Sequence, residues 1–134
     1  MNRYRIHLLL VVTVLVLTAC ASPLPPAVKV ADIPAVAGTY SGSMKEYGYT
    51  PRPTRLVINA DNSYELSTGG PEGARSTGVL AVAPDGTLGY VSSVAPTTAR
   101  TRGRGTVYQD ARRRVIVLSS EDGSITTQVE RSLP

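Results

Sequence analysis

From Gly38 onward the chain is a succession of short β-type runs, and this pattern limits the fold more than any other feature of the sequence. The runs are rich in Val, Ile, Thr, Tyr and Leu, none has a 3.6-residue helical period, and turn residues separate them. Turns such as Asp61-Asn62 and Pro84-Asp85-Gly86 are short, and short connections favour antiparallel neighbours. The expected strands are residues 38–45, 55–60, 63–68, 76–83, 87–93, 102–109, 113–119 and 124–131.

Eight strands in a meander favour a closed sheet. An open meander exposes two edges, whereas closure removes them, and eight strands make a small barrel that is either filled or holds one small ligand. We therefore expect an all-β fold, an eight-stranded antiparallel meander closed into a barrel, with a two-sheet sandwich as the alternative. A membrane-spanning barrel is disfavoured, because its strands need about 9 to 11 residues and aromatic girdles.

Alternation within the runs predicts which side chains face the interior, because successive side chains on a strand point to opposite faces. The apolar run 115–118 is continuous instead of alternating, so we expect that strand to be covered on both faces. The side chains expected to point inward are Leu56, Ile58, Tyr64, Leu66, Leu80, Val82, Leu88, Tyr90, Ile125, Thr127 and Val129.

A removable segment is expected at the N-terminus. Arg3 and Arg5 form a basic start, residues 6–17 are mostly apolar, and small residues follow, which is the order of a secretory signal. The apolar run has roughly 12 residues, fewer than the ~20 that a membrane-spanning helix needs. We divide the chain into a signal peptide (1–19), a lipidated cysteine with a proline-rich tether (20–37) and a barrel domain (38–134).

The motif Leu17-Thr18-Ala19-Cys20 resembles the lipobox of bacterial prolipoproteins, an aliphatic residue and two small residues before a cysteine. The resemblance implies signal cleavage between Ala19 and Cys20, a lipid on the Cys20 thiol, and acylation of the new amino group by a fatty acid such as palmitate. Two or three acyl chains anchor a protein stably, whereas one binds marginally. The alternatives are an ordinary signal peptide cut after Ala21, and a structural thiol.

The residue after the cysteine, Ala21, stands where inner-membrane lipoproteins of enteric bacteria often carry Asp. The resemblance therefore implies outer-membrane sorting and a periplasm-facing domain, with the inner membrane or the cell surface as alternatives. Residues 21–37 contain four prolines, so we expect an extended tether that spans on the order of 50 Å. The alternative is that Val28, Val30 or Ile33 adds a short edge strand to the domain.

The composition leaves few groups for catalysis or metal binding. His7 and Cys20 are the single histidine and cysteine of the chain, so zinc or copper sites and histidine-based triads are not expected. We also expect no cofactor and no enzymatic activity, because no carboxylates form an evident acid–base pair. The carboxylates considered are Asp61, Glu65, Asp85 and Asp110.

Arginines form the first candidate binding surface. Arg100, Arg102 and Arg104 are spaced by two, so on a strand they share one face, with glycines on the other. Guanidinium groups in such a row could bind phosphate or carboxylate groups; the alternative is a solvated outer face. Residues 112–114 are also arginines and either extend this surface or are solvated. Loss of the signal lowers the formal charge from +4 to +2, and nucleic acid is not an expected partner.

A second candidate surface is the loop Tyr47–Pro53, whose Tyr47 and Tyr49 would lie at a barrel mouth or a sandwich end. Aromatic and arginine side chains on such loops suit contacts with proteins or glycans. The alternative is that the loop covers the end of the core. The expected function is a non-enzymatic binding or interaction module, whose partner is an envelope protein or an anionic envelope component. The alternative is a carrier with a small apolar ligand inside the barrel.

The stretches Gly38-Thr39-Tyr40-Ser41-Gly42 and Leu56-Val57-Ile58-Asn59-Ala60-Asp61-Asn62-Ser63-Tyr64-Glu65-Leu66 resemble the opening of small lipocalin-like envelope lipoproteins. The nearest resemblance is to the N-terminal domain of the envelope-stress and copper-resistance lipoprotein family NlpE. It implies a lipocalin-like barrel. Members of that family typically carry a Cys-x-x-Cys pair between the two strands, whereas the interval 43–53 has no cysteine here, so a copper or redox role is not implied.

Overall fold

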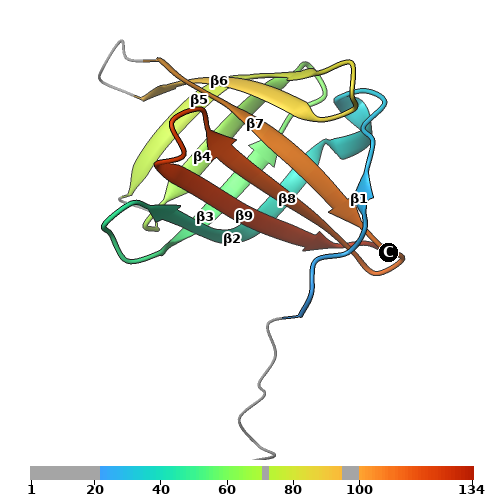
Figure 1. Cartoon of the computed structure of the whole chain (residues 1–134), viewed down its shortest axis with the longest axis horizontal. Coiled ribbons are helices and arrows are strands. Elements are labelled where there is room, and N and C mark those ends of the chain that lie inside the picture. The colour runs from blue at the N-terminus through green and yellow to red at the C-terminus, as the bar shows by residue number, and fades with distance from the viewer. Residues whose placement is uncertain (1–21, 71–72, 95–99) are drawn as a thin grey trace, which may run out of the picture.

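The computed structural model describes residues 22–70, 73–94 and 100–134, which form an all-β domain (Figure 1). One short 3-10 helix, η1 (Pro34–Val36), precedes the main sheet. The strands are β1 (Ala27–Val28), β2 (Gly38–Glu46), β3 (Arg52–Ile58), β4 (Ser63–Thr68), β5 (Ala74–Val82), β6 (Leu88–Val94), β7 (Arg100–Gln109), β8 (Arg113–Ser120) and β9 (Ile125–Ser132).

Strands β2 to β9 form a closed barrel. Each pairs antiparallel with its neighbour in the chain, and β2 pairs with β9 from Ser41 opposite Glu130 to Glu46 opposite Ile125, which joins the two ends of the meander. The expected eight-stranded antiparallel barrel is therefore confirmed, and the sandwich alternative is excluded. The largest difference from the expected strand bounds is at β3, which starts at Arg52 because Arg52 and Pro53 still pair with β2.

Aspartates organise four of the tight turns between the strands. In the turn between β3 and β4, the carboxylate of Asp61 accepts hydrogen bonds from the backbone N–H (3.0 Å) and the hydroxyl (2.6 Å) of Ser63. Asp85 does the same with Thr87, at 3.0 and 2.6 Å. Asp110 and Asp122 accept comparable bonds in the β7–β8 and β8–β9 turns. Such side-chain bonds are local alternatives to backbone pairing, which is why Asp favours turns.

The core fills the barrel on the side that alternation predicted. Leu56, Ile58, Tyr64 and Leu88 are at most 3% exposed and belong to one apolar cluster. Val115 has no exposed surface although it points away from this cluster, so β8 is covered on both sides at this point, as its continuous apolar run indicated.

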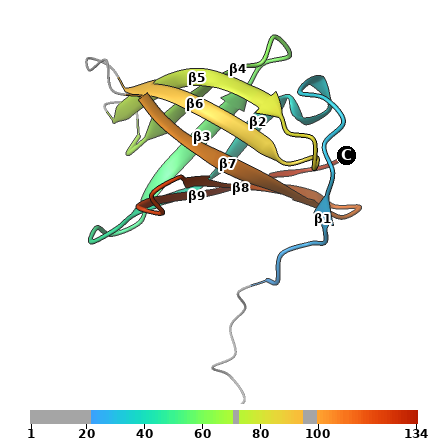
Figure 2. The same ribbon diagram turned by 45° about the horizontal axis from the view of Figure 1, so that its top comes forward.

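The N-terminal segment is part of the domain. Ala27 and Val28 of β1 pair with Tyr108 and Val107 of β7, which is the extra strand that the sequence left open as an alternative. Val30, Ile33 and Val36 are buried in the barrel core. Figures 1 and 2 show β1 and the following 3-10 helix at one end of the barrel, opposite the β2–β3 loop. Residues 25–37 thus close one end and cannot act as a spacer.

Three side chains from three strands hold this closed end. The Tyr40 hydroxyl donates to the carbonyl of Val36 (2.7 Å), and the guanidinium groups of Arg114 and Arg131 donate to the carbonyls of Ala35 (2.7 Å) and Ala37 (2.8 Å). The Arg131 guanidinium also lies 5.0 Å from the centre of the Tyr40 ring, a cation–π distance. A Cβ atom at Gly38 would clash with this guanidinium, and its φ of +141° further favours glycine.

Candidate functional site

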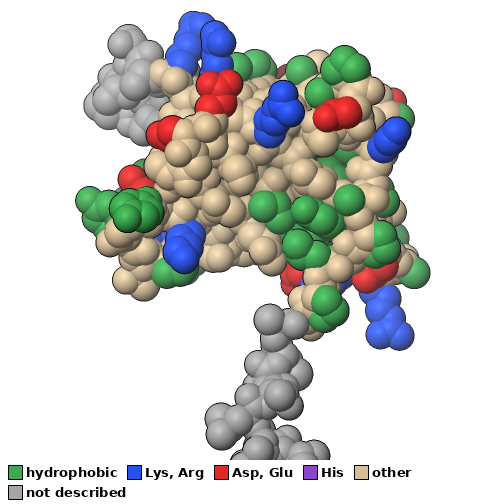
Figure 3. All heavy atoms as spheres, viewed as in Figure 1, with side chains coloured by type: hydrophobic (Ala, Val, Ile, Leu, Met, Phe, Trp, Pro, Cys, Tyr) green, Lys and Arg blue, Asp and Glu red, His purple; other side chains and the backbone are tan. Residues whose placement is uncertain are grey.

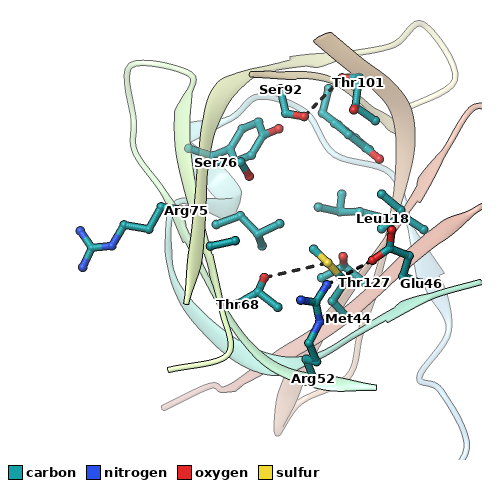
Figure 4. A pocket seen from close by; sticks show the side chains of 15 residues that line it. Met44, Glu46, Arg52, Thr68, Arg75, Ser76, Ser92, Thr101, Leu118 and Thr127 are labelled. Atoms are coloured by element: carbon teal, nitrogen blue, oxygen red, sulfur yellow. Dashed lines mark hydrogen bonds and ion pairs between the residues drawn. The ribbon is translucent and has the colours of Figure 1, made fainter. Parts of the chain in front are cut away.

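The opposite end of the barrel is open and contains a cavity of about 240 Å³. Its inner wall is formed by buried side chains of the four strands β4, β6, β8 and β9, and its rim by residues of β2, β3, β5 and β9 (Figure 4). The buried lining residues are Tyr64, Leu66, Thr68, Tyr90, Ser92, Leu118 and Thr127. Three of the residues expected to point inward, Tyr64, Leu66 and Tyr90, therefore contribute to a cavity wall as well as to the core.

Two tyrosines shape the wall by lying across glycines. Tyr64 is in register with Gly78 and Tyr90 with Gly103, and a Cβ on either glycine would approach the facing ring to 2.8 Å (Tyr64) or 2.6 Å (Tyr90). The two rings meet edge to face, with centroids 6.3 Å apart and planes at 89°. Glycine on the neighbouring strand therefore gives each ring room to lie flat along the barrel wall.

The inner wall is polar in places but carries no charge at neutral pH. Burial raises the pKa of Tyr64 to about 12, so its phenol stays protonated. Burial, and then the charges of Asp122 and Glu121, raise the pKa of Tyr90. The Ser92 hydroxyl donates to the Thr101 carbonyl at 3.5 Å. Neutral hydroxyl groups among Leu and aromatic surface suit a ligand that is mostly apolar and forms a few hydrogen bonds.

The charged side chains of the lining lie at the rim. The Arg52 guanidinium and the Glu46 carboxylate form an ion pair at 3.2 Å beside the opening, with about half of each side chain exposed (47% and 40%). Arg75 points away from the cavity, whereas Met44 and Thr68 lie together near the lower wall (Figure 4). An exposed pair of this kind contributes little to stability.

The three arginines of the first candidate surface lie on β7 as expected. Arg100, Arg102 and Arg104 are exposed, whereas Gly103 and Gly105 are buried on the inner side of the strand. Among the described residues, none of the three forms an ion pair. The positive charge of Arg104 helps to lower the pKa of Asp85, after the hydrogen bonds from Thr87.

The tyrosines of the second candidate surface are the most exposed aromatic residues described. Tyr47 is 86% and Tyr49 68% exposed, in the β2–β3 loop beside the rim residues Glu46 and Arg52. The loop thus lies at the mouth of the barrel and leaves the core uncovered.

The arginines at residues 112–114 have three different environments. Arg112 is exposed, and among the described residues its side chain has no hydrogen-bond partner. Arg113 binds Glu130 (3.1 Å) and the Pro23 carbonyl (2.7 Å), and Arg114 points into the closed end. Arg113 and Arg114 therefore neither extend the Arg100–Arg104 row nor are simply solvated. Neither role could be read from the sequence, because each depends on where the N-terminal segment lies.

Other expectations concern residues that carry no site in the structure. Ala19 and Cys20 lie outside the described residues. The carboxylates of Asp61, Asp85 and Asp110 are used in turns, which explains their positions locally. Among the described residues, no group of three or more His, Cys, Asp or Glu side chains could hold a metal ion, and no helix has the length and hydropathy to cross a membrane.

Comparisons with known proteins add no relative: no protein-family model, curated protein or solved structure matches the chain.

Proposed function

We propose that this chain is a lipid-anchored envelope lipoprotein of the outer membrane that faces the periplasm and binds a small, uncharged and largely apolar ligand in its barrel, without catalysis. The observation that carries the proposal is the open cavity of about 240 Å³ at one end of an otherwise filled barrel. The lipobox at Leu17–Cys20 supports the anchor. The kinship with lipocalin-like envelope lipoproteins stays a prediction.

The volume of the cavity limits the size of the ligand. An apolar cavity of about 150 Å³ is sufficient for benzene, whereas sites for drug-sized ligands occupy about 300–1,000 Å³. The cavity of this barrel lies between these values. It therefore suits one or two fused rings, or the end of an alkyl chain, and the hydroxyl groups of Tyr64 and Tyr90 are available to bind one polar atom.

A second candidate function is the docking of an anionic envelope component on the outer surface. Its support is the row of exposed guanidinium groups on Arg100, Arg102 and Arg104, which no described carboxylate neutralises in an ion pair. Arginine can bind carboxylate and phosphate groups with two parallel hydrogen bonds. This surface lies outside the barrel, so the two candidates depend on different residues.

Ligand binding in the cavity is testable with a matched pair of variants. Ser76 lines the cavity, whereas the next residue of β5, Thr77, is exposed on the outside. We expect indole and n-octanol, as neutral probes, to produce saturable shifts of the methyl NMR signals of Leu66 and Leu118 in the mature chain with Cys20→Ala. Ser76→Trp should fill the opening and abolish these shifts, whereas Thr77→Trp should leave them unchanged.

The outcomes separate the two candidate functions. Absence of saturable shifts with either probe would contradict the cavity proposal, provided that the spectrum shows a folded domain. Binding of an anionic envelope component that survives Ser76→Trp but is lost on charge reversal of Arg102 and Arg104 would instead favour the outer surface.

A further inference from the structure

The N-terminal segment leaves almost no slack between the proposed lipid anchor and the barrel. Ser22 is the first described residue, two positions after Cys20, and an extended chain covers at most about 3.6 Å per residue. Residue 20 therefore lies at most about 7 Å from Ser22. Ser22 itself lines a shallow groove with Gln128 and Glu130 on the outside of β9.

Four contacts prevent the residues after Ser22 from acting as a longer tether. The Pro23 carbonyl accepts a hydrogen bond from Arg113 (2.7 Å), and the Pro26 carbonyl accepts one from the backbone N–H of Gln109 (3.0 Å). β1 then pairs with β7, and the backbone N–H of Val30 donates to the Gly86 carbonyl (2.9 Å). The segment is thus attached to the barrel from Pro23 onward.

The surface around this attachment has the composition that a bilayer surface favours. Among the residues that the structure describes, Leu24 and Val28 are two of the five large apolar side chains that remain exposed, at 43% and 37%. Figure 3 shows apolar side chains gathered on this face toward the closed end, with the charged ones mainly around the margin. Lys29, which follows β1, and Arg112, in the β7–β8 turn, are exposed beside this face together with one carboxylate of the same turn, Asp110. Basic side chains are attracted to anionic headgroups.

We propose that the bilayer surface is the partner of this face, so that the barrel lies against the membrane through Leu24–Val28 and the adjoining start of β8. The inference rests on the proposed lipid anchor at Cys20. The short connection keeps this face at the headgroups, and the apolar side chains are buried there. The cavity mouth has Glu46 and Arg52 at its rim, beside the β2–β3 loop, and this loop lies at the other end of the barrel from β1 (Figures 1 and 2), so the mouth remains open to the aqueous phase.

Site-specific labels can test this orientation in the full lipidated protein. The mature chain has no cysteine besides Cys20, whose thiol would carry the lipid, so an introduced cysteine is the single free thiol. Ala27 and Ala81 are both exposed strand alanines, on β1 and on the outside of β5, and Tyr49 lies at the mouth. Ala27→Cys, Ala81→Cys and Tyr49→Cys would each carry bimane in phosphatidylethanolamine–phosphatidylglycerol vesicles that contain a headgroup nitroxide lipid.

We expect nitroxide quenching to be several-fold stronger for the label at position 27 than for those at positions 81 and 49. Arg113→Gln, which releases the Pro23 carbonyl, should reduce the difference, whereas Arg112→Gln should preserve it. Flotation of the vesicles reports the anchor separately, because a protein that fails to float lacks the lipid. Equal quenching at the three positions of a floating protein would overturn the orientation. If the bimane label at position 27 stays shielded from the aqueous phase when the vesicles are replaced by detergent, the face would be assigned to a second copy or a protein partner instead.

Discussion

Arg114 shows how much of the closed end depends on single side chains. Its guanidinium donates to the Gln109 side chain at 2.6 Å and to the Ala35 carbonyl at 2.7 Å, and approaches the Tyr40 hydroxyl to 3.5 Å. Hydrogen bonds to charged groups are worth about 1.5–3 kcal/mol each, and loss of a donor also leaves its acceptors unpaired. The guanidinium group therefore joins β7, β8 and the N-terminal segment.

We expect Arg114→Met to lower the free energy of unfolding by about 2–3 kcal/mol, because a methionine keeps the apolar stem but donates to none of these groups. Arg112→Met is the matched control. Its side chain is exposed, and its backbone bond to Asp110 is unaffected, so the change should stay within about 0.5 kcal/mol. Urea unfolding of both variants measures the difference, and equal stability would contradict the role of Arg114.

For single residues, the alternation of side chains along a strand predicted the observed positions better than the pattern of charged residues did. The inward positions of Leu56, Ile58 and Tyr64 follow from a period of two, which is a local property of each strand. The positions of Arg113 and Arg114 differ from those of solvated turn arginines because each also donates to a carbonyl of the N-terminal segment, Pro23 or Ala35, which lies 90 or 79 residues away in the chain. No local pattern contains that information.

The segment from Val28 to Val36 is the element whose role was least evident in the sequence. The four prolines of residues 21–37 favoured a tether, and the edge strand was the alternative, because Val28, Val30 and Ile33 alone do not specify a partner. The partner is an unoccupied stretch of β7. β6 pairs with β7 only as far as Gly105, so the residues of β7 beyond it are open on that side, and β1 pairs there. That opening results from the stagger of a closed barrel.

If this element is part of the core, a small change within it should destabilise the whole domain. Ile33 is 3% exposed, and removal of a buried isoleucine side chain beyond Cβ costs about 2–5 kcal/mol. We therefore expect Ile33→Ala to lower the free energy of unfolding by about 2–4 kcal/mol in a single cooperative transition. A segment that acted as a tether would leave that free energy unchanged.

A matched control for Ile33 lies at the other end of the barrel. Ile125 is partly exposed at the rim of the cavity, so Ile125→Ala removes side-chain surface that is already in contact with solvent. Its cost should be clearly smaller than that of Ile33→Ala. Urea denaturation followed by circular dichroism compares the two variants, and the reverse order would show that the closed end is not the more tightly packed one.

For the molecule as a whole, closure could be predicted and the cavity could not. Closure follows from the edges that eight short antiparallel strands would otherwise expose. The cavity depends on register, because Tyr64 meets Gly78 and Tyr90 meets Gly103 only in this particular pairing. It also depends on the N-terminal segment, which fills one end and leaves the other open. A barrel with both ends filled would have the same strand pattern in its sequence.

The turn aspartates predict how the stability of the whole barrel depends on pH. Hydrogen bonds from Ser63 lower the pKa of Asp61, those from Thr87 lower the pKa of Asp85, and those from Arg112 and Arg113 lower the pKa of Asp110. The largest of these shifts is at Asp122, where bonds from Ser120 and Ser124 lower the pKa to about 2. In the unfolded chain these carboxyls titrate near their ordinary value of about 3.9.

Because the folded-state pKa values are the lower ones, each ionised carboxylate stabilises the folded state above pH ~4, and this stabilisation is lost as the pH falls toward the folded-state pKa. We therefore expect the urea midpoint to be constant from pH 7 to about 5 and to fall steadily between about pH 4 and 2.

Asp122→Asn should lower the urea midpoint at pH 7, because the amide oxygen is a weaker acceptor than the carboxylate, and should flatten the fall of the midpoint between about pH 4 and 2. Glu121→Gln, which changes the neighbouring exposed carboxylate that accepts none of these bonds, controls for net charge. A midpoint that is as high at pH 2.5 as at pH 7 would contradict the role of the turn carboxylates, and an equal fall of the midpoint at acid pH in the two variants would contradict that of Asp122.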